Sequence, residues 1–295
     1  EIIPIICSVK NAKMLSKVLQ TLKINTIYHA AAYKHVPLVE MNIIEGIINN
    51  VFGTNTLIQK AIENSVETCI LVSTDKAVRP SNYMGASKRL AELICQARSI
   101  ENKGTIISIV RFGNVLGSSG SVVPKFRKQI REGGPITVTH KDINRYFMTI
   151  QEAAQLVIQA GAIAKGGEVF VLDMGNPIKI FDLAKKMIRL HGFSPYFSGS
   201  GPKNAGDIEI LITGLRPGEK LFEELLTSGN PIGTIHPRIM AASEPSINTA
   251  ELDVLLKKLW LAAENFDIEE IRKIIAETTV GFETTIDHKS FDWQK

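Results

Sequence analysis

Cysteine is scarce in this chain of 295 residues, and the three that occur, Cys7, Cys69 and Cys95, lie far apart. Their spacing matches no metal-binding pattern, and it is typical of reduced core residues in a cytosolic protein rather than of a disulfide framework. We therefore predict a cytoplasmic protein without a metal site.

Long apolar runs are also absent. No stretch reaches the length of a membrane span, and residues 1–4 lack the layout of a signal peptide. Repeats and low-complexity segments are missing too, while a hydrophobic content of 44% is ordinary for a globular protein that buries a full core.

Neither sign of charge dominates. The chain has 34 lysines and arginines against 30 aspartates and glutamates, well interspersed, for a net charge of +4. This balance is too mild to indicate a nucleic-acid partner, but it suits a small anionic substrate.

What the chain does contain is a regular alternation of strand and helix patterns. Apolar β-rich runs predict strands at 2–9, 24–29, 68–73, 105–112, 135–139 and 169–172. Helical spacing lies between them, at 12–22, from about 49 to 62, at 82–100 and at 150–164, where Thr149 and Glu152 form a capping box. This alternation predicts an α/β fold with a parallel sheet and right-handed crossovers.

The character of the chain changes after residue 174. Shorter elements with Gly/Pro-rich joints follow, including 198–202, and two amphipathic helices are expected within 255–276. Pro217 suits a turn before a helix over 221–226, which leaves Arg216 able to reach a phosphate with its planar fork. We therefore predict a larger domain over 1–174 and a smaller α+β lobe over 175–295.

The strongest site pattern is the end of the strand at 68–73. The apolar run stops in Ser73, Thr74, Asp75 and Lys76, and ligands of open α/β sheets bind outside the carboxyl ends of the strands. On the next helix, Met84 and Lys88 share one face. The alternatives are that Lys88 is an ordinary solvated lysine and that the polar residues only form a turn and a cap.

A second strand end carries His29, Ala30 and Ala31. Small residues there let a flat ligand approach the backbone closely, although plain packing of a helix on the sheet explains them equally well. The basic segment with Lys125 is either a solvated helix face or part of an anion site.

Together these segments resemble the extended short-chain dehydrogenases, and within them the large, CapD-like UDP-N-acetylglucosamine 4,6-dehydratases of bacterial polysaccharide and glycan synthesis. The resemblance covers most of residues 24–226 in the family's order. It rests on 29–37, 49–54, 73–88, 111–124, 137–140, 145–149 and 215–220.

The resemblance implies a Rossmann-like doubly wound parallel sheet that binds NAD within 1–174, with 114–149 contributing to the substrate site, and a substrate-binding lobe over 175–295. The Gly-x-x-Gly-x-x-Gly loop that holds the dinucleotide pyrophosphate is absent. We therefore expect the chain to start beyond the first strand and that loop, with one sheet edge exposed. A tether to the inner membrane is expected only through a region preceding this chain, and a homo-oligomer, dimer or higher, built on the long helices is the default expectation.

The implied reaction is redox-neutral. NAD oxidises C4 of UDP-N-acetylglucosamine, water leaves across C5 and C6, and hydride returns to C6, which gives the UDP-4-keto-6-deoxy-N-acetylhexosamine. Asp75 is the proposed acid at the C6 hydroxyl, Lys76 the base at C5, and Thr74 the hydrogen-bond partner of the C4 oxygen. Met84 stands where ordinary members of the superfamily have the tyrosine base, so Asp75 is also a candidate to remove the C4 hydroxyl proton.

The remaining site residues follow from the same resemblance. The predicted cofactor contacts are His29, Ala30, Ala31, Ser73 and Lys88. The predicted substrate contacts are Lys34, Asn114, Thr137, Thr139, Arg145, Arg216 and Glu219, with Asn114 and Arg216 on the diphosphate and Thr137 and Thr139 beside the uracil. Two rival readings are a UDP-sugar 4-epimerase and an inactive nucleotide-sugar-binding fragment.

Overall fold

The computed structural model describes residues 1–197, 207–226, 231–278 and 282. The chain divides into two compact units. The first unit consists of Glu1–Phe112, Leu156–Asp173 and Leu225–Lys295, and the second of Gly113–Gln155 and Met174–Glu224. One division between the units, Asp173/Met174, lies beside the predicted 174/175 boundary, but the chain leaves the first unit and returns to it twice, so each unit is made of separate segments.

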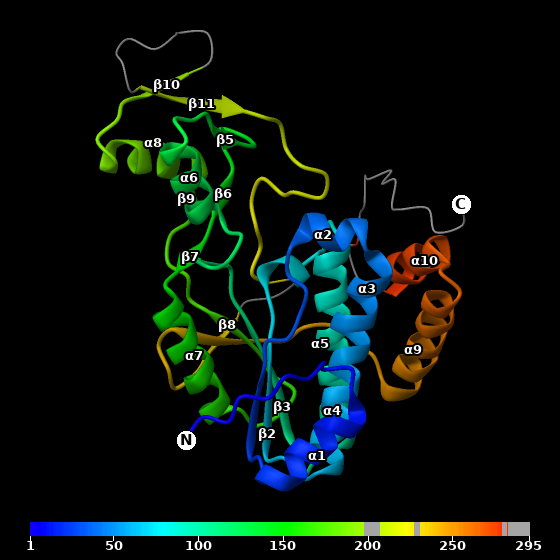
Figure 1. Ribbon diagram of the computed structural model, residues 1–295. Coiled ribbons are helices and arrows are strands. Elements are labelled where there is room, and N and C mark those ends of the chain that lie inside the picture. The colour runs from blue at the N-terminus through cyan, green and yellow to red at the C-terminus, as the bar shows by residue number, and fades with distance from the viewer. Residues whose placement is uncertain (198–206, 227–230, 279–281, 283–295) are drawn as a thin grey trace. The chain divides into compact units, whose positions relative to one another are not determined.

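The first unit is built on a six-stranded sheet in the order β1-β2-β3-β8-β13-β12 (Figure 1). Strands β1 (Thr26–His29), β2 (Thr68–Val72), β3 (Ile106–Arg111) and β8 (Val169–Leu172) are parallel. Strands β13 (Ile239–Ala242) and β12 (Ile232–Gly233) extend the sheet in antiparallel fashion. The predicted Rossmann-like α/β fold with a parallel-dominated sheet is confirmed.

Successive residues of β2 face opposite sides of the sheet, as strand geometry requires. Leu71 packs in one apolar cluster with Ala91 and Cys95 of helix α5 (Tyr83–Glu101), a cluster that also takes in α4 (Gly53–Glu63) and α1 (Ala12–Leu22). Ile70 meets the other side, where its Cγ1 would lie 3.3 Å from a Cβ placed on Gly161 of α7 (Ile150–Ile163). Helices thus cover both faces, which makes the sheet doubly wound.

Helix α5 is buried from Tyr83 to Ala97 because further helices of the same chain cover it. One apolar cluster joins α5 to α2 (Val36–Met41), α3 (Ile43–Ile47), η1 (Ile48–Phe52), α9 (Thr249–Glu264) and α10 (Ile268–Thr278). The two predicted C-terminal helices are confirmed, but they belong to the first unit rather than to a substrate lobe. Assembly through the long helices stays a prediction, and the covered side of α5 is not available for it.

Three local predictions were wrong. Residues 2–9 form no strand, and Ile2 and Ile6 are 93% and 103% exposed, because no neighbouring strand pairs with them. Residues 221–226 form no helix, since Pro217 opens an irregular segment whose Leu221 carbonyl accepts the backbone N–H of Asn144. Strand β13 pairs with β8 and β12 pairs with β13, so both strands belong to the main sheet instead of forming part of a separate lobe.

The edge expected beside β1 is present. Among the described residues β1 pairs with β2 alone, so its other side offers unpaired backbone groups.

The second unit is a small α+β structure. Strands β10 (Pro195–Phe197), β11 (Ile208–Ile212) and β5 (Ile136–Val138) form a parallel sheet, and α6 (Val122–Arg131) and α8 (Ile180–Leu190) pack with it around Phe126 and Ile188. Short ladders pair β4 (Asn114–Val115) with β7 (Phe147–Met148), and β6 (Asn144–Arg145) with β9 (Ile178–Lys179). The predicted capping box at Thr149 and Glu152 is confirmed by two reciprocal backbone contacts.

Two features are absent from the residues that the structure describes. No helix there is long and apolar enough to cross a membrane. No cluster of three or more His, Cys, Asp or Glu side chains there could hold a metal ion.

Candidate active site

Strand β2 ends at Val72, and the backbone then bends into a single 3₁₀ turn, η2 (Asp75–Ala77). Thr74 caps this turn by accepting the backbone N–H of Lys76 with its hydroxyl oxygen, and Asp75 N–H donates to the Phe112 carbonyl at 3.2 Å. In a straight strand adjacent side chains would diverge. The bend brings them together: Lys76 Nζ lies 3.0 Å from Asp75 Oδ1.

The Asp75 carboxylate is completely buried. Its Oδ1 accepts from both Lys76 Nζ and the Thr74 hydroxyl, the latter at 2.9 Å. Its Oδ2 has no hydrogen-bond partner among the described residues. A buried carboxylate oxygen without a donor is costly, so it indicates a position that a proton or a ligand group completes.

Helix α5 packs directly against this turn. Asn82 begins the helix by accepting the Gly85 N–H at 2.8 Å, and the Glu40 carboxylate from α2 accepts the Tyr83 N–H at 2.6 Å. A Cβ on Gly85 would lie only 2.2 Å from the Lys76 carbonyl oxygen. The glycine therefore lets the helix set the position of the Asp75–Lys76 turn.

We expect Gly85→Ala to lower the free energy of unfolding by about 1–3 kcal/mol, since the clash is with backbone and no side-chain rotation relieves it. Gly104→Ala is the matched control, because its Cβ would lie 3.5 Å from the Asn102 side chain, an ordinary contact. Urea unfolding of both variants measures the difference. Equal stability of the two variants would contradict the close approach.

Met84 and Lys88 occupy the same helix but different surroundings. Met84 is 3% exposed and belongs to the apolar cluster around α5, where a thioether packs well but cannot act as a base. Lys88 is buried, and its Nζ donates to the Val72 carbonyl at 2.7 Å. Burial lowers the pKa of Lys88 to about 8, against the opposing effect of Glu92.

His29 lies at the end of β1 and is held from α4. Thr54 donates its hydroxyl hydrogen to the Asn50 carbonyl at 2.6 Å, so the 2.9 Å contact between Thr54 and His29 Nε2 requires Nε2 to be the donor. Nε2 therefore carries a proton. Burial, and then the Lys88 charge, lower the pKa of His29 to about 3.

A pH dependence of stability follows from His29. The unfolded chain takes up a proton on His29 below its ordinary pKa of 6.5, whereas the folded chain does so only near pH 3. The folded state therefore loses stability as the pH falls from about 6.5 towards about 3. We expect His29→Gln, which keeps a donor, to remove about 3 kcal/mol of the decline between pH 7 and pH 4. Urea unfolding at each pH measures the free energy of unfolding of both proteins. An equal decline of this free energy in the two proteins between pH 7 and pH 4 would refute the assignment.

The loop after β1 is tied to the π-helical segment η1. Asn50 accepts the Tyr33 N–H at 2.7 Å and donates to the Tyr33 carbonyl at 3.0 Å and to Ser87 of α5 at 2.9 Å. Asn49 donates to the Ala31 carbonyl at 3.3 Å. The wider turn of η1 brings both asparagines onto the loop, as π-helical turns often do at functional sites.

Ser73 is engaged within the protein. Its hydroxyl donates to Glu92 at 2.6 Å, and Glu92 also binds Arg111 and Arg89. In this conformation the Ser73 side chain joins a buried ionic network rather than an open site.

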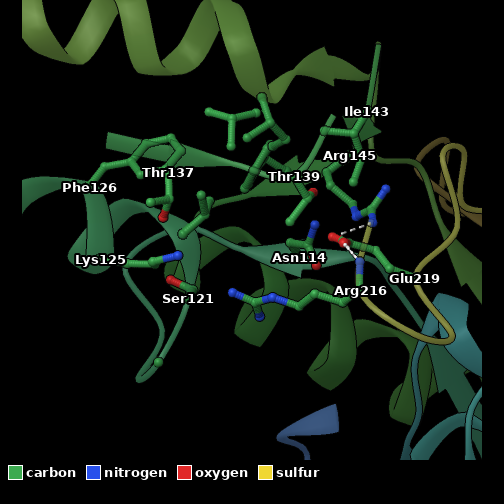
Figure 2. A pocket seen from close by; sticks show the side chains of 15 residues that line it. Asn114, Ser121, Lys125, Phe126, Thr137, Thr139, Ile143, Arg145, Arg216 and Glu219 are labelled. Atoms are coloured by element: carbon green, nitrogen blue, oxygen red, sulfur yellow. Dashed lines mark hydrogen bonds and ion pairs between the residues drawn. The ribbon is translucent and has the colours of Figure 1, made fainter. Parts of the chain in front are cut away.

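The second unit contains a pocket of about 200 Å³ (Figure 2). Six of the seven predicted substrate residues line it: Asn114, Thr137, Thr139, Arg145, Arg216 and Glu219. Lys34, the seventh, belongs to the first unit and is not among the lining residues. The pocket is also lined by residues that were not predicted, among them Ser121, Val122 and Phe126. The apolar residues could not be recognised from the sequence, because their helical or strand spacing indicates only a core.

Positive charge dominates the pocket. Arg145 is paired with Glu219 at 3.4 Å and Glu223 at 3.7 Å, and Glu219 also accepts the Arg216 backbone N–H at 3.1 Å. The Arg216 side chain extends across the pocket toward Lys125 (Figure 2). Neither Lys125 nor the Arg216 guanidinium forms an ion pair within the described ranges, and burial, followed by Arg216, lowers the pKa of Lys125. Lys125 therefore lines this pocket, and a role in binding an anion there stays a prediction.

Comparison with known proteins assigns the family. A family model described as "Polysaccharide biosynthesis protein" matches residues 1–244, and the chain belongs to this family. Over 279 residues it is 48% identical to the capsular polysaccharide biosynthesis protein CapD of Staphylococcus aureus, which covers 93% of this chain and 44% of that protein. The chain thus spans less than half the length of this relative.

Relatives with enzyme names are more distant. The UDP-N-acetylglucosamine 4,6-dehydratase (inverting) of Campylobacter jejuni is 35% identical over 233 residues, 78% of this chain and 64% of that protein. A UDP-glucose 4-epimerase of Rickettsia rickettsii is 36% identical over 222 residues, 75% of this chain and 60% of that protein.

Among solved structures, Pen from Bacillus thuringiensis superposes with a TM-score of 0.72 at 33% identity, covering 86% of this chain and 81% of that one. DesIV, a dTDP-glucose 4,6-dehydratase from Streptomyces venezuelae solved with NAD and TYD bound, gives 0.64 at 20% identity, over 74% of this chain and 69% of that one. This second match supports the fold.

The residues fit one end of the nicotinamide dinucleotide. The buried Lys88 ammonium has three hydrogens and gives one to Val72, which leaves two for ribose hydroxyls. Among the other predicted contacts, the His29 and Ser73 side chains are engaged internally, and Ala30 and Ala31 offer backbone only. The Gly-rich turn that holds the pyrophosphate does not occur in this sequence.

Proposed function

We propose that this chain is the catalytic part of an NAD-dependent 4,6-dehydratase that converts UDP-N-acetylglucosamine to the UDP-4-keto-6-deoxy-N-acetylhexosamine for a bacterial surface polysaccharide or glycan. The observation that carries the proposal is the contact of Asp75 with Lys76 at 3.0 Å, in a turn against which helix α5 packs. Helix α5 also carries the buried Lys88 and has Met84, which cannot act as a base, four residues before it. Elimination of water needs an acid and a base close together, and this pair supplies both.

The 3.0 Å contact also suggests how the pair begins and ends a cycle. Transfer of one proton from Lys76 Nζ to Asp75 Oδ1 converts the ion pair into a neutral amine and a neutral acid. The amine then removes the C5 proton while the acid protonates the departing C6 hydroxyl, and the ion pair is restored. The proton that the C4 hydroxyl loses on oxidation is balanced by the proton that C5 takes up when hydride returns to C6, and both exchange with solvent. NAD, when bound, supplies the hydride acceptor for C4 and the hydride donor for C6.

Thr74 and Lys88 have supporting roles in this proposal. The Thr74 hydroxyl gives its hydrogen to Asp75 in the present conformation, so it must rotate to donate to the C4 oxygen. Lys88 would hold the nicotinamide ribose. In the second unit, Lys125 and Arg216 would bind the diphosphate, because an ammonium and a guanidinium that form no ion pair among the described residues bind phosphate strongly.

The deciding experiment is proton NMR of UDP-N-acetylglucosamine incubated with the complete protein and NAD in deuterated water. Dehydration replaces the C6 hydroxymethyl signals by a methyl signal. It also places deuterium from the solvent at C5, so the C5 proton signal is lost. A 4-epimerase would instead give an epimer with its C6 hydroxyl intact, and an inactive binding fragment would leave the substrate unchanged. Either result would sink the proposal.

A further inference from the structure

Helix α6 holds one residue of strand β5 by a two-point contact. Thr137 donates its backbone N–H to Gln129 Oε1 at 3.2 Å, and Gln129 Nε2 lies 2.9 Å from Thr137 Oγ1. Both residues lie in the second unit, and Thr137 lines its pocket.

The donor and the acceptor of both hydrogen bonds in this contact can be assigned. A backbone N–H can only donate, so the Gln129 atom opposite it has to be the carbonyl oxygen. The amide nitrogen therefore faces the hydroxyl, and because an amide nitrogen can only donate, Thr137 Oγ1 has to accept. The hydroxyl hydrogen of Thr137 is consequently excluded from Gln129 and remains available to donate elsewhere.

The surroundings of Thr137 favour a ring as the recipient. Thr137 lies beside Phe126 in the pocket (Figure 2), and Val122, Ile143, Phe147 and Ile180 add further apolar lining. Polar and charged side chains, among them Lys125 and Arg216, line the pocket as well, and an apolar wall with a few polar groups of defined direction is typical of a site that orients a flat heterocycle.

We infer that the Thr137 hydroxyl donates a hydrogen bond to a carbonyl oxygen of a pyrimidine base. Gln129 is the positioning residue, because its amide occupies the acceptor side of this hydroxyl and leaves it only a donor. The inference rests on the proposed function for the presence of a nucleoside diphosphate in this pocket. A uracil ring presents a carbonyl oxygen at position 4, where cytosine presents an amino group that can only donate. The pocket thereby selects UDP over CDP.

The test is the ratio of the affinities for UDP and CDP, measured by isothermal titration calorimetry on the complete protein. We expect the wild-type protein to prefer UDP by about tenfold or more, as a single matched base contact does. Gln129→Glu keeps the shape of the side chain, but both carboxylate oxygens accept, so the Thr137 hydroxyl turns its hydrogen toward the carboxylate and its lone pairs toward the ligand. The preference for UDP should then fall at least tenfold or reverse.

Two further variants separate polarity from charge and folding. Thr137→Val removes the hydroxyl at constant shape and should reduce UDP binding while leaving CDP binding unchanged, whereas Thr137→Ser should keep the preference. Gln155→Glu adds the same charge at an exposed position and should leave the ratio as it is.

An equal loss of affinity for both nucleotides in Thr137→Val and Gln129→Glu would mean that the hydroxyl contacts phosphate, and it would overturn the inference while the proposed function stands. An unchanged ratio in Gln129→Glu would also overturn it. Failure of the wild-type protein to bind either nucleotide would instead refute the proposed function.

Discussion

Replacing Lys76 with alanine is expected to lower dehydration of UDP-N-acetylglucosamine by the complete protein by about 10²–10⁴-fold, the usual contribution of a positioned general base. The variant loses both the amine that removes the C5 proton and the donor 3.0 Å from Asp75. Binding of UDP should change little, since the anion pocket lies among other residues. The measurements are the initial rate of keto-sugar formation and the calorimetric affinity for UDP.

Lys257→Ala serves as the control for this variant, because Lys257 is exposed on α9 and contacts none of the proposed site residues. It should retain the wild-type rate. If Lys76→Ala turned over substrate at a similar rate to this control, Lys76 could not be the base at C5.

The second large effect is expected in the buried ionic network of the first unit. Arg111 Nε and Nη2 contact Glu92 at 2.7 and 2.6 Å, Nη1 contacts Glu244 at 2.8 Å, and all three side chains are fully buried. Burial raises the pKa of Glu92, but the Arg111 guanidinium, together with Arg89 and the Ser73 hydroxyl, outweighs burial and lowers the pKa to about 2. Arg111→Met would remove the cation that both carboxylates share and leave Glu92 with Arg89, and we expect a loss of about 3–5 kcal/mol in the free energy of unfolding.

The exposed pair of Lys128 and Glu132, 3.7 Å apart on α6, supplies the control. Lys128→Met should cost less than about 1 kcal/mol in the same urea experiment. Adding Arg89→Met, Glu92→Leu and Glu244→Leu to Arg111→Met should recover much of the loss, because the four buried charges of the network are then removed together. A mild effect of Arg111→Met by itself would show that water or other cations compensate.

Much of the fold could be predicted because its signals are local. The strands β1, β2, β3 and β8 are short apolar runs, and the helices between them show their periodicity within a few turns. The segment 2–9 shows why such signals fail: it has the composition of a strand, but a strand requires a partner, and none lies beside it among the described residues. Strand β13 shows the converse, because its pairing with β8 joins segments far apart in the chain.

The candidate site was predictable to a similar degree. The order Ser-Thr-Asp-Lys after a buried strand indicated a strand-end site, and the resemblance supplied six residues that line one pocket. Gln129 and Glu40 were not predictable, since each acts through hydrogen bonds to a residue on another element.

The sequence by itself determined which elements form and which polar groups stand at the strand ends, because hydrophobic period and turn chemistry act over a few residues. Only the tertiary structure decided that Asp75 contacts Lys76, that the Ser73 hydroxyl donates to Glu92, and that the C-terminal helices cover α5. Those outcomes depend on backbone bends and on contacts between distant segments, and such contacts form only when the whole core packs.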